Sequence, residues 1–181
     1  MRRVALAIWA VNILVVAVSA QQPDTAIVPG ERIGPISLRM HIADAAKILG
    51  TPKPATLLSD PSTVIVPRPE GAVAYYWESS KFFVQTNRLG EIYIVQVYLV
   101  NASDPSTKYA TSTGLRLGSR DTDVQTTFGA PSRIVSRVEK SGFRSDVLVY
   151  DKQGILFFVN ASQGQYKGAV YAISVFAPPN Q

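Results

Sequence analysis

The chain has 181 residues, of which 46% are hydrophobic, and a formal net charge of +5. It contains no cysteine and one histidine, so disulfides, thiol nucleophiles, thiolate metal sites and a lipid anchor on an N-terminal cysteine are excluded. Without Arg2 and Arg3 the chain has 16 basic and 13 acidic residues, a net charge of about +3, which is too small to indicate a nucleic-acid partner. The 161 residues that follow the first 20 have the size and composition of one globular unit that folds on its apolar core alone.

The N-terminus predicts an exported protein. Arg2 and Arg3 precede an apolar stretch over residues 4–18, and Val18-Ser19-Ala20 supplies the small residues that a signal peptidase needs. We expect residues 1–20 to be a signal peptide cleaved after Ala20, leaving a periplasmic or secreted protein with no stable membrane insertion. The alternative is an uncleaved anchor, but the apolar run lies at the short end of the ~17 to 25 residues that span a bilayer.

One pattern occurs twice in the chain. The first copy reads Ile36-Ser37-Leu38, then Asp44 and Leu49-Gly50-Thr51-Pro52, and the second reads Leu115-Arg116-Leu117, then Asp123 and Phe128-Gly129-Ala130-Pro131. Shared order with small changes of spacing is what a duplication followed by loop insertions leaves. The predicted organisation after the signal peptide is an N-terminal extension (21–29), repeat 1 (30–102), a linker (103–107) and repeat 2 (108–177).

Each copy is expected to hold one short helix followed by antiparallel strands. In the second copy Ser119 is the expected N-cap, Val124 and Phe128 share one face, and Gly129 ends the helix. The first copy offers Met40 or His41 at the cap, and neither residue type caps well. Strands rich in Val, Ile, Tyr and Phe are predicted over 73–77, 81–86, 91–100, 132–138, 146–150, 155–160 and 169–176, and the five prolines of residues 51–71 predict a long loop.

This combination of a hydrophobic-x-Leu opening, a helix with an early Asp, a Leu/Phe-Gly-x-Pro element and closing strands resembles the tandem repeat of the beta-lactamase inhibitory protein and the related BamE-type lipoproteins of outer-membrane assembly. The resemblance covers most of the mature chain, although the lipoprotein cysteine and the intra-repeat cysteine pairs are absent. It implies an α+β fold of two tandem repeats, in which helices back an antiparallel sheet and the open face meets a protein partner.

Strand alternation assigns the residues of the two sheet faces. The large apolar positions that both copies keep are expected to face the helix-covered core: Phe82, Val84, Tyr93, Val95, Val97, Phe157, Val159, Tyr171, Ile173 and Val175. The other face then carries Phe83, Gln85, Ile94, Gln96, Tyr98, Phe158, Asn160, Ala172, Ser174 and Phe176. Aromatic, amide and small hydroxyl groups without charge are typical of a recognition surface. The alternatives are a second core under the Pro-rich loop or the other copy, and a self-pairing homodimer.

A cluster of basic residues predicts a second kind of surface. Arg133, Arg137, Lys140 and Arg144 lie on or near one predicted hairpin. The cluster could hold an envelope-surface adaptor to an anionic lipid or polymer, although such charges commonly only protect a sheet edge.

No residues in the sequence point to catalysis, a cofactor or a metal. His41 has no second histidine and is assigned no role, and Asp44 and Asp123 are explained by their favourable position in a helix first turn. We therefore expect a binding module of the bacterial envelope and not an enzyme.

Overall fold

The structure is a computed structural model that describes residues 24–56, 65–99, 105–138 and 141–179. Within these ranges 12 strands form two sheets, with 43% of the structure in strands and 13% helical. The predicted signal peptide and Lys140 lie outside the described residues. No helix among the described residues is long and apolar enough to cross a membrane.

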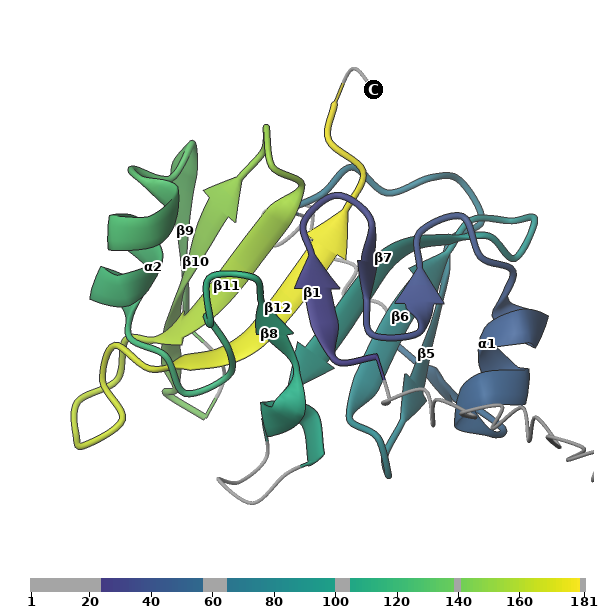
Figure 1. Ribbon diagram of the computed structural model, residues 1–181, viewed down its shortest axis with the longest axis horizontal. Coiled ribbons are helices and arrows are strands. Elements are labelled where there is room, and N and C mark those ends of the chain that lie inside the picture. The colour runs from purple at the N-terminus through teal and green to yellow at the C-terminus, as the bar shows by residue number, and fades with distance from the viewer. Residues whose placement is uncertain (1–23, 57–64, 100–104, 139–140, 180–181) are drawn as a thin grey trace, which may run out of the picture.

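An eight-stranded antiparallel sheet forms the body of the molecule (Figure 1). Its strand order is β4 (Lys53–Ala55), β5 (Val73–Trp77), β6 (Phe82–Thr86), β7 (Ile92–Tyr98), β12 (Val170–Phe176), β11 (Ile155–Asn160), β10 (Arg144–Tyr150) and β9 (Arg133–Val138). Seven of these eight strands were predicted, with bounds that differ by two residues at most. The eighth, β4, falls in the predicted loop and contains Pro54, which an edge strand tolerates.

A second, smaller sheet covers the middle of one face of the large sheet. It consists of β3 (Ile36–Ser37), β2 (Arg32–Ile33), β1 (Ala26–Val28) and β8 (Ala110–Thr111), in that order, and a 3-10 turn (Pro105–Lys108) precedes β8. Helices α1 (Ile42–Leu49) and α2 (Asp121–Phe128) flank it at opposite ends of the molecule (Figure 1). Each helix has eight residues and is only about 12 Å long.

The predicted fold class is therefore wrong. The protein is mostly β, with two sheets, and is not an α+β arrangement of two repeats backed by helices. Two helices of this length cannot cover eight strands, so the small sheet supplies most of the missing apolar cover. Its Ile27, Ile33 and Ile36 are almost completely buried in the core against the large sheet.

The helix starts also differ from the prediction. His41 caps α1, because its Nδ1 accepts a hydrogen bond from the Ala43 backbone nitrogen at 3.2 Å. The N-cap of α2 is Arg120, whose backbone nitrogen donates to the Asp123 carboxylate at 3.1 Å. Ser119, the predicted cap, instead accepts from the Arg116 nitrogen at 3.1 Å. The interior of α2 follows the prediction, with Val124 fully buried.

Two bulges change which residues face the core. Gln85 pairs with Ile94 and Thr86 with Ile92, so Tyr93 is an extra residue in β7. In the same way Phe158 pairs with Ala172 and Val159 with Val170, so Tyr171 is extra in β12. Each extra residue shifts the alternation. Tyr93 and Tyr171 therefore lie on the face opposite the small sheet, which corrects their predicted place in the main core.

Candidate functional site

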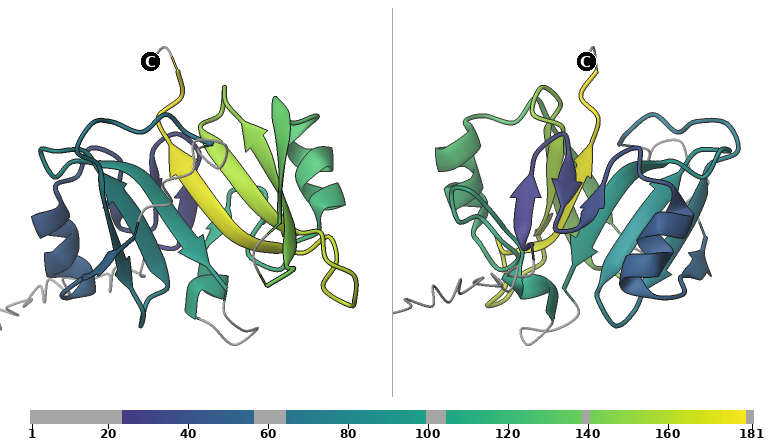
Figure 2. Two further views of the ribbon diagram at one scale, coloured as in Figure 1. Left: turned by 180° about the vertical axis from the view of Figure 1, so that it is seen from behind. Right: turned by 45° about the vertical axis from the view of Figure 1, so that its right-hand side comes forward.

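The face of the large sheet that turns away from the helices and the small sheet contains the predicted partner-binding residues (Figure 2, left). Three of them are buried, with exposed fractions of 7% for Ile94, 2% for Ser174 and 3% for Phe176. The others are half-buried: Phe83, Gln85, Gln96, Tyr98, Phe158 and Asn160. The prediction thus placed these residues on a common face but did not anticipate how much of it is covered.

The cover comes from the Pro-rich segment after residue 64. Ile65 and Val66 pack on a small second core of the sheet, which includes Ile94, Leu156 and Phe176. Arg133 fixes this segment, because its Nη2 donates to the Ile65 carbonyl oxygen at 2.5 Å. In Figure 2 (left) the segment runs along the upper end of the sheet. The alternative prediction, a second core under this loop, therefore describes one end of the face.

A groove of about 320 Å³ remains beside this segment. Six predicted residues line it, namely Phe83, Gln85, Ile94, Gln96, Phe158 and Ser174. Two further lining residues were predicted elsewhere, Arg137 in the basic cluster and Tyr171 in the core. The remaining lining residues were not predicted: Thr56, Ile65, Val66, Arg68 and Leu156. Leu156 could have been predicted, because it lies two residues before Phe158 on β11 and so shares its face of the sheet. Nothing in the sequence indicated that the Pro-rich segment returns over the sheet.

Two hydroxyl groups fix the amide side chains of the groove face. The Tyr93 hydroxyl donates to Gln85 Oε1 at 2.6 Å, and the Ser174 hydroxyl donates to Gln96 Oε1 at 2.8 Å. Burial raises the pKa of Tyr93, while the nearby charge of Arg68 acts in the opposite direction. The tyrosine therefore stays a neutral donor at ordinary pH, and both amide oxygens are occupied.

The charges that line the groove are all positive among the described residues. Arg68 and Arg137 contribute guanidinium groups, and no carboxylate side chain of the described residues lines the groove. The side chain of Arg137 makes no hydrogen bond or ion pair with any described residue, whereas Arg133 lies 3.4 Å from the Asp151 carboxylate. The groove therefore combines an apolar floor with cationic and amide groups.

Of the four basic residues predicted as an anionic-ligand patch, the three that the structure describes do not share one face of the sheet. Arg133 and Arg137 each lie two residues from Val135 on β9, so all three side chains point to the same face of the sheet. Val135 packs on the core of the groove face, and the two arginines therefore share that face. Arg144 pairs with Val138 on the neighbouring strand and lies on the opposite face, together with Leu148 and Tyr150 of the main core.

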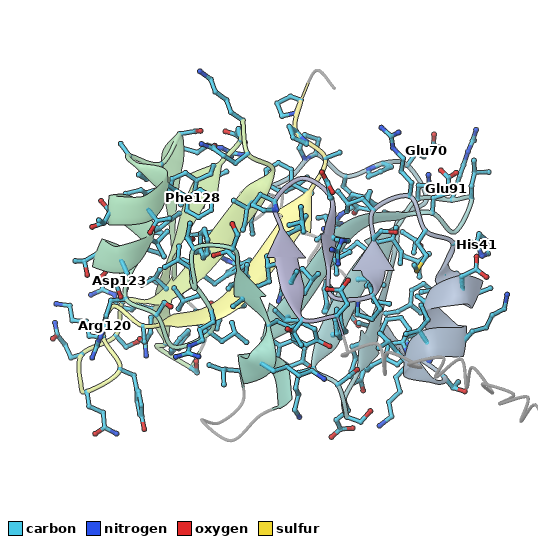
Figure 3. All side chains as sticks on the ribbon, in the orientation of Figure 1. His41, Glu70, Glu91, Arg120, Asp123 and Phe128 are labelled. Atoms are coloured by element: carbon cyan, nitrogen blue, oxygen red, sulfur yellow. The ribbon has the colours of Figure 1, made fainter. Side chains whose placement is uncertain are left out.

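The remaining candidates of the sequence analysis have structural roles. His41 caps α1 and Asp123 accepts from the α2 N-cap, and Figure 3 shows these two residues at opposite ends of the molecule. Asp44 binds Lys47 at 2.7 Å on the exposed side of α1, and this bond lowers the pKa of Asp44. The two aspartates are therefore no carboxylate pair. The described residues contain no group of three or more His, Cys, Asp and Glu side chains that could hold a metal.

Comparisons with protein-family models, with curated proteins and with solved structures find no match to this chain. The resemblance to the beta-lactamase inhibitory protein and the BamE-type lipoproteins stays a prediction from short motifs.

Proposed function

We propose that the protein is an exported, non-enzymatic binding module of the bacterial envelope that recognises a protein partner through the groove face. The observation that carries this proposal is the composition of the groove, where half-buried aromatic and amide side chains surround about 320 Å³ of open space. Aromatic groups around a partly enclosed hollow are the usual anchors of protein recognition.

The packing of the groove face supports recognition rather than a simple second core. Ile94 and Phe176 already form a closed cluster with Ile65. Phe83 and Phe158 lie beside that cluster and keep part of their surface accessible in the groove. A solvent-exposed apolar hollow on a sheet face that is otherwise covered is common at interaction sites.

The other parts of the proposal come from the sequence. The basic and apolar residues 1–20 support export, and the small-residue site at Ala20 supports cleavage. The non-enzymatic character is supported by the single histidine, whose Nδ1 is used to cap α1. The alternative adaptor function is less well supported, because among the described residues Arg144 lies on the face opposite Arg137.

Affinity capture from envelope extract tests the proposal. The bait proteins are the parent, Phe83→Ser in the groove, and Tyr166→Ser as a matched control, because Tyr166 is an aromatic residue outside the groove that is 61% exposed. We expect one protein to be retained by the parent and by Tyr166→Ser at about 0.15 M salt and to be lost by folded Phe83→Ser. Equal recovery by all three baits, or recovery only at low salt, would refute the proposal.

A further inference from the structure

We propose that the groove selects an extended partner segment in which acidic side chains flank apolar ones. This inference rests on the proposed function, since it describes the chemistry of the protein partner at the groove face. The observations that carry it are the orientation of two amide groups, the position of two arginines and the apolar floor between them.

The amides offer donors to a ligand. The oxygens of Gln85 and Gln96 already accept hydrogen bonds from Tyr93 and Ser174. The amide nitrogens of both glutamines have no hydrogen-bond partner in the described part of the chain, and both side chains line the groove. An amide nitrogen carries two N–H donors, so a ligand here is favoured when it brings acceptor oxygens.

The arginines place positive charge at two separate positions. Arg137 stands on β9, at one edge of the large sheet. Arg68 also lines the groove, and it lies near enough to Tyr93 of β7 for its charge to oppose the rise that burial causes in the pKa of the Tyr93 hydroxyl. Four strand spacings of about 4.8 Å separate β7 from β9, roughly 19 Å along the sheet. An extended peptide rises about 3.3 Å per residue, so about six residues span this distance.

The floor between the two charges is apolar. Leu156 and Phe158 of β11 lie between β7 and β9, and the ring of Tyr171 of β12 packs at a tilt against that of Phe158, with ring centroids 5.9 Å apart. A segment with a carboxylate near each end and large apolar side chains between them complements this arrangement. Carboxylates also form the stronger, charge-assisted hydrogen bonds with a guanidinium group.

A polypeptide fits these observations better than a fatty acid does. A fatty acid concentrates its acceptor oxygens in one head group. The groove distributes its donors over Gln85, Gln96 and Arg137, on three strands. A peptide brings backbone carbonyl oxygens along its whole length in addition to its acidic side chains, and so supplies an acceptor at each of these positions.

Selection from a random peptide library displayed on phage tests the inference with the full chain as target. We expect the enriched peptides to carry Asp or Glu about six positions apart with aromatic or aliphatic residues between them. For a synthetic copy of the most enriched peptide, Arg137→Gln should raise Kd about tenfold or more, because a hydrogen bond to a charged group contributes about 1.5–3 kcal/mol. The matched control Arg144→Gln, on the opposite face, should leave Kd unchanged.

Two results would overturn the acidic selectivity. One is enrichment of peptides that bind through Phe83 but carry no acidic residue, and this result would leave the groove face itself intact as a binding site. The other is tighter binding of dodecanoate, used as the amphiphile probe, than of any selected peptide. Binding of the selected peptides that is unaffected by Phe83→Ser would instead count against the proposed function, together with equal capture by the three bait proteins.

Discussion

The small sheet should be essential for stability, and Ile33→Ala measures its contribution. Ile33 has an exposed fraction of 0% and lies between Ile27 of β1 and Ile36 of β3. The substitution removes three carbon atoms, worth about 2.4 kcal/mol at about 0.8 kcal/mol for each buried CH₂. Incomplete collapse of the cavity adds to this cost. We expect the free energy of unfolding to fall by about 3 kcal/mol, within the range of 2–5 kcal/mol usual for such changes.

Urea unfolding followed by circular dichroism gives this quantity directly, provided that the slope against urea stays unchanged. Ile48→Ala is the matched control, because Ile48 is 49% exposed on α1 and its truncation should cost less than about 1 kcal/mol. Equal costs for the two variants would show that the small sheet is not part of the cooperative core. The reasoning that β1, β2 and β3 replace the expected helix cover would then fail.

Three further predictions follow from single contacts. Gly154→Ala should destabilise the fold by about 2–3 kcal/mol in a thermal melt, because φ is +67° and the added Cβ would overlap a carbonyl oxygen of β12. Tyr150→Phe should cost about 0.5–1.5 kcal/mol in urea unfolding, because the Tyr150 hydroxyl donates to the Gly129 carbonyl oxygen at the end of α2 at 3.1 Å. An NMR titration should give Asp44 a pKa below 3.8 that rises in Lys47→Gln; ionised Asp44 then supports stability above its unfolded pKa and loses this effect as pH falls through the folded pKa.

The long strands were predictable because each combines residues with high strand propensity and clear breaks. β11 was predicted with its observed bounds, and β5 likewise, since turn residues enclose runs of aromatic and branched side chains. Face assignment also succeeded where alternation is regular, as at Phe83 and Gln85 on β6. These local signals determine the strand and its two faces, but not what covers each face.

The cover was not predictable for a physical reason. The strands β2, β3 and β8 have two residues each, which is too short for an alternating pattern to appear in the sequence. Their place depends on long-range pairing, such as the parallel pairing of Ala26 with Ala110. The return of Ile65 over the sheet depends in the same way on its distant contact with Arg133.

The bulges connect the main error in face assignment with the chemistry of the groove. Regular alternation places Tyr93 in the core, whereas the extra residue turns it to the groove face. There its hydroxyl occupies the oxygen of Gln85 and leaves the amide nitrogen for a ligand. The sequence alone does not mark this shift, because residues 92–95 are all apolar; only the structure shows that the fully buried positions of β7 are Ile92, Val95 and Val97, with a spacing of three and then two residues. The irregularity that prevents a simple assignment of β7 is therefore also what gives the groove its donor character.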